Sequence, residues 1–67
     1  MIPVVLNGEP AEAAAGTTLL AFLAAQGEPY DAGLVERNGR LVRREDLAAT
    51  ALAAGDRIEV VLPAFGG

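Results

Sequence analysis

The chain has 67 residues, with nine acidic and five basic side chains and a net charge of −4 at neutral pH. It contains no cysteine and no histidine, which excludes disulfide bonds, thiolate metal ligands, a cysteine nucleophile and the usual acid-base group near pH 7. This length allows one domain with a small core, and the acidic balance argues against nucleic acid as a partner.

No apolar run approaches the length of a membrane span. The apolar stretch 2–6 is too short for a signal peptide and lacks a basic flank. We therefore expect a cytoplasmic protein that does not associate with membranes.

The first 15 residues predict a β-hairpin. Residues 2–6, IPVVL, are apolar and β-branched, and Asn7-Gly8 follows directly as a type I′ turn signal. The return strand is expected over 10–15, with Pro10 at its start, where a missing N–H is tolerated.

Residues 16–27, GTTLLAFLAAQG, predict the main helix. Thr17 or Thr18 can cap its N-terminus, and Gly27 supplies a left-handed C-cap. The apolar stripe expected on its buried face is Leu19, Leu20, Leu23 and Ala24.

The second half of the chain predicts a further hairpin and a final strand. Residues 33–42, GLVERNGRLV, indicate two short strands around a turn at Asn38-Gly39. Residues 43–56 indicate an irregular or short helical crossover, in which 43–46, RRED, is interpreted as a solvated turn with local ion pairs rather than a docking site. Residues 57–63, RIEVVLP, alternate like a strand whose pairing stops at Pro63.

Together these elements predict an α+β fold in which a mixed sheet packs on one main helix. The first and last strands are the most apolar and should be central. The residues expected at the heart of the core are Val4, Leu6, Leu23, Ile58 and Val60. We expect one domain over 1–63 and a flexible tail over 64–67.

The last six residues, LPAFGG, raise the question of function. Four residues beyond Pro63 reach at most about 13 to 14 Å, enough to enter another protein's active site, and glycine fits a narrow slot. The reactive group would be the α-carboxylate of Gly67, which is ionised and needs activation, most simply by condensation with ATP. Since the chain lacks residues for that step, we expect a carrier rather than an enzyme, with an activating enzyme as its partner.

Four stretches, LNGEP, AGTTLLAFL, ERNGRLVRREDL and LAAGDRIEVVLPAFGG, resemble the ThiS-type sulfur carriers of thiamin biosynthesis, a ubiquitin-like β-grasp family. The resemblance implies that an E1-like adenylyltransferase of the ThiF type adenylates Gly67 and that a persulfide sulfur replaces AMP. The terminal thiocarboxylate would then deliver sulfur to thiazole synthase. Gly66 and Gly67 match the family's functional pair, and no cofactor or metal is implied. Departures from the family pattern at Glu36, Arg37 and Arg43 lead us to expect a third strand that is a more exposed edge.

Docking of partners is expected near the tail. Val5 and Val61 should face away from the helix, side by side if the first and last strands pair, and Phe65, between Ala64 and Gly66, should anchor the tail through its ring. Three alternatives stay open: a MoaD-type carrier for molybdopterin synthesis, a prokaryotic ubiquitin-like modifier joined to lysines, and a binding module with an inert tail.

Overall fold

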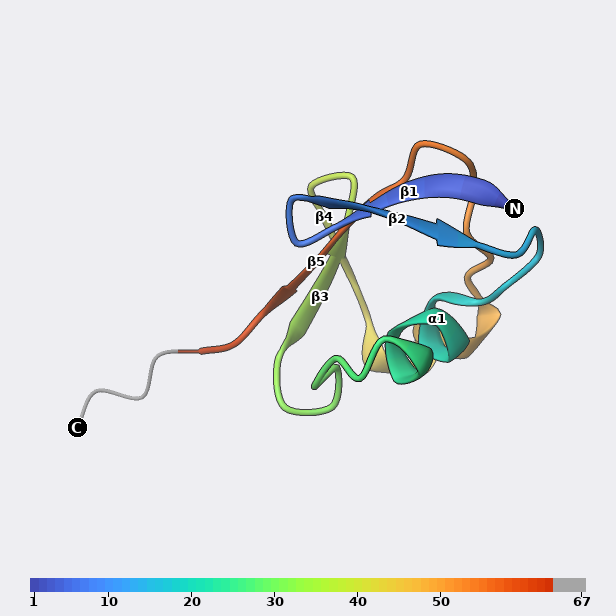
Figure 1. Ribbon diagram of the computed structural model, residues 1–67. Coiled ribbons are helices and arrows are strands. Elements are labelled where there is room, and N and C mark those ends of the chain that lie inside the picture. The colour runs from blue at the N-terminus through green and yellow to red at the C-terminus, as the bar shows by residue number, and fades with distance from the viewer. Residues whose placement is uncertain (64–67) are drawn as a thin grey trace.

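The structure is a computed structural model that describes residues 1–63, so the predicted tail over 64–67 lies outside the described residues. Its elements, in chain order, are β1 (Ile2–Leu6), β2 (Glu9–Ala13), α1 (Leu19–Ala25), β3 (Leu34–Arg37), β4 (Arg40–Val42), the 3₁₀-helix η1 (Arg44–Ala49) and β5 (Arg57–Val61). The helices cover one face of the sheet and leave the other face open (Figure 1). The predicted α+β fold, a mixed sheet on one main helix, is confirmed.

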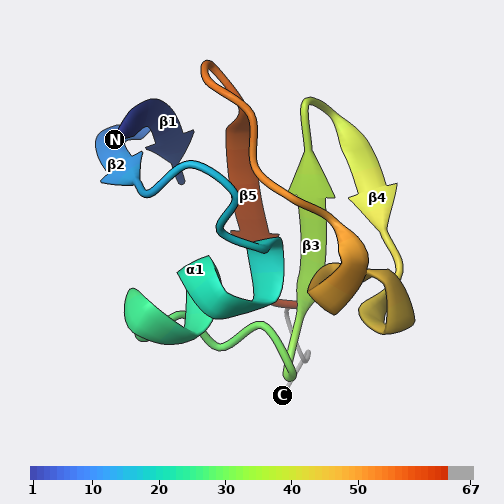
Figure 2. The ribbon, with the colours of Figure 1, turned by 90° about the vertical axis from the view of Figure 1, so that its right-hand side faces the viewer.

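The five strands lie in the order β2-β1-β5-β3-β4. β1 and β5 run parallel, and the other neighbouring strands pair antiparallel. Figure 2 shows β5 between β1 and β3, so the last strand is the central one and the first lies beside it, as predicted.

The prediction that the third strand is an edge was wrong. β3 lies between β5 and β4, and β4 forms that edge of the sheet. The reason is the tight turn at Asn38-Gly39, which folds β4 back along the free side of β3. Glu36 and Arg37 are only half-buried on this inner strand, which explains why their charges are tolerated there.

Both Asn-Gly pairs form the predicted hairpin turns. Asn7 and Gly8 have φ values of 51° and 82°, and Asn38 and Gly39 have φ values of 54° and 81°. These left-handed angles belong to a type I′ turn, whose twist matches that of the strands it joins. The first return strand begins at Glu9, one residue before the predicted start, and ends at Ala13.

Helix α1 begins as predicted but buries a different face. The Thr18 hydroxyl accepts a hydrogen bond from the Ala21 N–H at 3.2 Å, and Gly27 has a φ of 72° beyond the C-terminus. The prediction for Ala24 was wrong, because it is exposed and Phe22 is buried in its place. The buried positions therefore follow the spacing i, i+3 and i+4, from Leu19 through Phe22 to Leu23, which is the spacing of one helix face.

The core lies between α1 and the covered face of the sheet. Of the five residues predicted at its heart, Val4, Leu6, Leu23 and Ile58 are buried, whereas Val60 is only partly buried. The other buried apolar residues among those described are Ala13, Leu19, Phe22, Val35, Leu47 and Leu52.

Residues 44–52 close the core on the side of α1. Leu47 and Leu52 are buried, and the Leu19 N–H donates to the Thr50 carbonyl at 2.8 Å. The Leu52 N–H donates to the Thr17 carbonyl at 2.9 Å, so the crossover is tied to the start of α1 by main-chain bonds. Within residues 1–63, neither helix has the length and apolar character needed to cross a membrane.

Candidate functional site

The described chain leaves the fold at the end of the central strand. Pairing of β5 ends at Val61, two residues before Pro63, and both Leu62 and Pro63 are exposed. Gly33 packs on this end, since a Cβ at that position would lie 2.6 Å from the Val61 carbonyl oxygen. The loop before β3 can therefore close on the end of β5 only because residue 33 is a glycine. The predicted tail residues Ala64, Phe65, Gly66 and Gly67 lie outside the described residues.

Exposed apolar side chains gather beside this exit, and those of Leu34, Leu41 and Val61 lie on the open face of the sheet. Leu34 is paired with Val61 across β3 and β5, and Leu41 lies diagonally from Leu34 on β4. Leu34, Leu41, Val61 and the following Leu62 are 54%, 60%, 41% and 54% exposed. We call these four residues the apolar patch. Contiguous apolar surface of this kind marks sites of interaction with other proteins.

Val5 does not lie beside Val61, contrary to the prediction. In the parallel pairing of β1 with β5, Val5 is level with Arg57. Val61 lies four residues further along β5, a distance of about 13 Å at the usual rise of a strand. The prediction assumed that the first and last strands pair, but it did not specify which residues lie opposite one another. Val5 instead lines a separate hollow of about 380 Å³ together with the charged side chains of Arg57 and Glu59.

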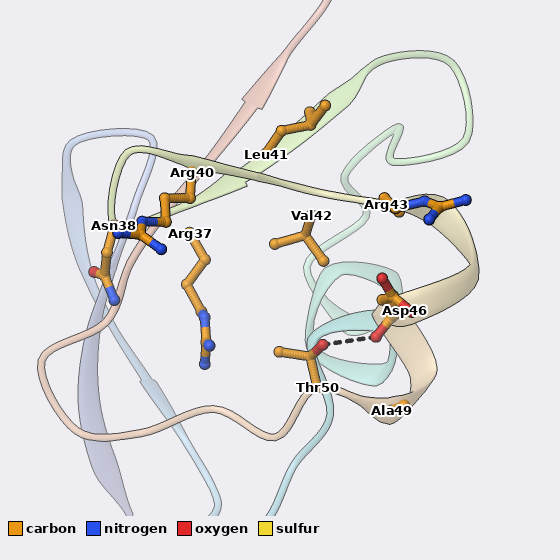
Figure 3. A pocket seen from close by; sticks show the side chains of 9 residues that line it. All are labelled: Arg37, Asn38, Arg40, Leu41, Val42, Arg43, Asp46, Ala49 and Thr50. Atoms are coloured by element: carbon orange, nitrogen blue, oxygen red, sulfur yellow. Dashed lines mark hydrogen bonds between the residues drawn. The ribbon is translucent and has the colours of Figure 1, made fainter.

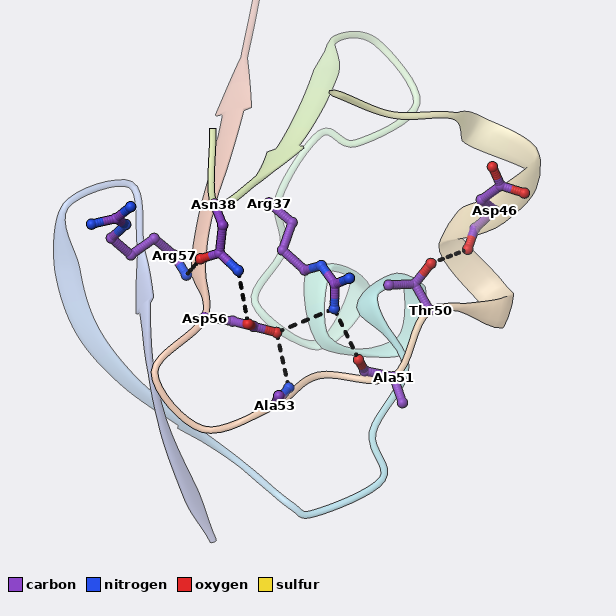
Figure 4. A network of polar contacts seen from close by, with 8 residues as sticks. All are labelled: Arg37, Asn38, Asp46, Thr50, Ala51, Ala53, Asp56 and Arg57. Carbon is purple, nitrogen blue, oxygen red and sulfur yellow. Dashed lines mark hydrogen bonds and ion pairs between the residues drawn. The ribbon is translucent and has the colours of Figure 1, made fainter. Parts of the chain in front are cut away.

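A polar network anchors the start of β5 (Figure 4). The buried carboxylate of Asp56 accepts hydrogen bonds from the Ala53 N–H at 2.9 Å and from the Asn38 side-chain amide at 3.0 Å. It also forms an ion pair of 3.5 Å with Arg37, which donates to the Ala51 carbonyl as well. Burial alone would raise the pKa of Asp56, but the hydrogen bonds and the charge of Arg37 together hold it below its ordinary value of 3.8.

The asparagines of the two turns hold β5 from both sides. On the β1 side, the Asn7 side-chain oxygen accepts from the Val60 N–H at 2.9 Å. On the β3 side, the Asn38 side-chain oxygen accepts from the Arg57 N–H at 2.8 Å. Each asparagine side chain thus supplies the acceptor that a main-chain carbonyl of the neighbouring strand would otherwise provide, at the point where that strand has entered its turn. We call Asn7 and Asn38 the asparagine clamps.

Sequence reasoning missed the roles of Leu34, Leu41 and Asp56. The sequence did contain a signal for Leu34. Side chains alternate between the two faces of a strand, so in GLVER the side chain of Leu34 lies on the face opposite to that of the buried Val35. No local signal could identify the Asp56 network, since Asp56 and its partners Arg37 and Asn38 lie 18 or 19 residues apart in the chain. The local ion pair predicted in the RRED segment is present, because Arg43 lies 2.7 Å from Glu45 and both side chains are exposed.

This five-stranded sheet, with a parallel central pair and one main helix across it, defines a ubiquitin-like β-grasp protein. The family model described as the ThiS family matches residues 4–67. The chain therefore belongs to the ThiS family, the ThiS-type sulfur carriers.

Individual relatives agree with this assignment. The crystal structure of thiamine biosynthesis protein ThiS from Geobacter metallireducens matches with a TM-score of 0.85 and 28% sequence identity, over 98% of this chain and 100% of that chain. The solution structure of a thiamine biosynthesis protein from the same organism matches with a TM-score of 0.73 and 28% identity, over 98% of this chain and 88% of that chain.

A curated relative is a thiazole synthase from Magnetococcus marinus, 45% identical over 62 residues. The match covers 92% of this chain and 19% of that protein, so the chain corresponds to a small part of the length of this relative.

Proposed function

We propose that this protein is the sulfur carrier for thiazole formation in thiamin biosynthesis and has no catalytic activity of its own. The observation that carries the proposal is membership of the ThiS family over residues 4–67, a range that includes Gly66 and Gly67. The fold supports it, because the central strand β5 leads directly toward the C-terminal residues and its end is held by main-chain packing at Gly33.

The chemistry takes place on the C-terminal carboxylate. The Gly67 carboxylate attacks the α-phosphate of ATP on a ThiF-like adenylyltransferase, which releases pyrophosphate and gives an acyl-adenylate. A persulfide sulfur then attacks the acyl carbon and AMP leaves. A thiol that cleaves the resulting acyl disulfide becomes part of a new disulfide and frees the thiocarboxylate. Since the chain contains neither cysteine nor histidine, the sulfur nucleophiles and the imidazole groups that usually transfer protons near pH 7 come from partners.

The thiocarboxylate sulfur then replaces a carbonyl oxygen of a substrate held by thiazole synthase, and that oxygen passes to the acyl carbon of Gly67, which returns to a carboxylate. The similarity of this chain to part of the Magnetococcus marinus thiazole synthase supports thiazole synthase as the partner. Family membership favours this route over molybdopterin synthesis by a MoaD-type carrier. We expect the reaction cycle to take place in the cytoplasm.

Intact-mass analysis tests the proposal. The protein is incubated with a ThiF-like adenylyltransferase, ATP and a persulfide donor, and we expect one terminal oxygen to be replaced by sulfur. A variant with one alanine added after Gly67 should not gain sulfur, so its mass should stay unchanged. A control variant with one alanine added before Met1 should gain sulfur like the unmodified chain. Absence of the sulfur product in the unmodified chain would contradict the proposal, and Gly67 linked to lysines of other proteins would favour the modifier. A deletion strain that requires a molybdopterin product instead of thiamin would favour the MoaD-type alternative.

We further propose that the apolar patch and Phe65 dock the adenylyltransferase. Leu41 is 60% exposed, and fully burying a leucine side chain contributes about 1.5 to 3 kcal/mol, so we expect Leu41→Thr to raise KM for the carrier about tenfold with kcat unchanged. Phe65→Ala should act in the same way. The control is Val5→Thr, on the same face but level with Arg57. Equal effects of Leu41→Thr and Val5→Thr would contradict this docking surface.

A further inference from the structure

A groove of about 670 Å³ lies between the β3–β4 hairpin and η1, on the side of the sheet that the helices cover (Figure 3). Three arginines line it: Arg37, Arg40 and Arg43. Asp46 adds a carboxylate from η1 and Val42 an apolar side chain, whereas the side chain of Leu41 points away from the groove (Figure 3). We call this hollow the arginine groove.

Positive charge is concentrated at this place in an acidic chain. The net charge is −4, yet four of the five basic residues lie between positions 37 and 44, and three of these four line the arginine groove. The fifth, Arg57, lies in the separate hollow with Val5 on the open face of the sheet. Asp56 offsets the charge of Arg37, Glu45 offsets that of Arg43, and Asp46 adds a further carboxylate, so Arg40 is the groove arginine without an acidic partner among the described residues.

One of the three guanidinium groups, that of Arg40, is free for an incoming ligand, and that of Arg43 is held only by an exposed ion pair. Arg37 is engaged with the buried Asp56. Arg40 is exposed, and its guanidinium group makes no hydrogen bond or ion pair with any part of residues 1–63 that the structure describes. Arg43 is paired with Glu45, but these side chains are 72% and 64% exposed, and such a pair contributes about 0 to 1 kcal/mol. Arg43 can exchange that partner for another carboxylate at little cost.

We propose that the arginine groove receives an acidic segment of the protein that adenylates the tail, an inference that rests on the proposed function. Arginine binds carboxylates through two parallel hydrogen bonds, which suits aspartate and glutamate side chains. Leu41 and Arg40 are neighbours on the edge strand β4; Leu41 belongs to the apolar patch and Arg40 lines the groove, so a partner seated on the patch has to cross only this edge strand to reach the groove. Nucleic acid fits poorly, because the net charge of −4 opposes binding to phosphates.

Charge reversal tests this interaction. Arg40→Glu changes the net charge by two in the groove, and Arg57→Glu changes it by the same amount outside the groove. We expect Arg40→Glu to lower kcat/KM for adenylation about tenfold at low salt, with kcat at saturating carrier unchanged, because charges at an interface act mainly on association. At about 1 M salt, where screening acts over about 3 Å, the loss should largely disappear. Arg57→Glu should stay within about twofold of the unchanged protein under both conditions.

Arg43→Gln gives a second variant in the groove and should lower kcat/KM about threefold at low salt. Far-UV circular dichroism and urea midpoints verify that each variant is folded. An Arg57→Glu effect equal to that of Arg40→Glu would assign the loss to overall charge and overturn the proposal. No effect of Arg40→Glu and Arg43→Gln would overturn it too, and the proposed function would stand as long as the unchanged protein is adenylated.

Binding of a random single-stranded oligonucleotide that Arg40→Glu abolishes would assign the groove to nucleic acid and overturn the acidic-segment proposal. If the ThiF-like enzyme fails to adenylate the unchanged protein, the proposed function and this inference both fall.

Discussion

Replacing Asp56 by asparagine should remove much of the stability of this small fold. Asp56 is 6% exposed, and its carboxylate accepts from Ala53, Asn38 and Arg37. An amide of the same shape keeps one acceptor oxygen, but its NH₂ group then faces either the Ala53 N–H and Arg37, which share one carboxylate oxygen, or the side-chain NH₂ of Asn38. At least one donor inside the network loses its acceptor, and Arg37 loses its counter-charge.

Hydrogen bonds to charged groups contribute about 1.5 to 3 kcal/mol each, and an unsatisfied buried donor costs about 1 to 3 kcal/mol. Because the remaining oxygen still accepts one bond, we expect Asp56→Asn to lower the free energy of unfolding by about 2 kcal/mol. A core of this size supports a net stability of only about 3 to 5 kcal/mol, so the loss is a large fraction of the total.

The effect depends on pH in a defined direction. The folded-state pKa of Asp56 lies below its ordinary value of 3.8, so its charge stabilises the fold fully above that value. The stabilisation is lost as the pH falls below 3.8 and through the folded-state pKa, because the carboxyl group then takes up a proton. The difference between the unchanged protein and Asp56→Asn should therefore be constant near pH 7 and shrink on acidification.

Urea unfolding followed by circular dichroism, at pH 7 and at steps below pH 4, measures this difference. The control is Asp46→Asn, an exposed carboxylate on η1 whose loss should change stability by no more than about 0.5 kcal/mol. An Asp56→Asn variant as stable as the control at pH 7 would refute the reasoning. A difference that persists unchanged to the lowest pH would also refute it, because the charge would then not be the cause.

Three further predictions concern the clamps, the exit and the core. Asn7→Gly keeps the left-handed turn but removes the acceptor for the Val60 N–H. Stability should fall by about 1 kcal/mol, and the Val60 amide should exchange faster with solvent in NMR; an unchanged exchange rate would argue against the clamp. Gly33→Ala brings a Cβ within 2.6 Å of the Val61 carbonyl oxygen and should cost about 1 to 3 kcal/mol in urea unfolding, and a neutral result would mean that the loop relaxes freely. Phe22→Ala should cost about 3 to 5 kcal/mol and leave little folded protein by circular dichroism, whereas Ala24→Ser on the exposed face should behave like the unchanged chain.

Local signals were sufficient to predict the elements of this fold. Asn7-Gly8 and Asn38-Gly39 predict their turns because few other pairs tolerate two successive positive φ values. The alternation around Ile58 likewise predicts a strand with one buried face. These features depend on residues close together in the chain, so one sequence is enough to find them.

Features that depend on register between distant segments were not predictable. The placement of Val5 beside Val61 was wrong because pairing alone does not give the offset between two strands. The buried role of Phe22 was missed because a helix of seven residues contains too few turns for its apolar face to be located unambiguously. Asp56 and the groove arginines depend on contacts between elements, which sequence spacing alone does not reveal.

The parallel pairing of β1 with β5 also constrains how this chain is made. The Asn7 clamp joins residues 53 positions apart, so the centre of the sheet is complete only after β5 has been synthesised. While β5 is still inside the ribosome the two hairpins cannot join into one sheet, because β1 and β3 both pair with β5 and not with each other. We expect a protease to cut chains arrested at this stage under conditions in which it spares the finished protein. Folded molecules should therefore form only from chains that extend through residue 61.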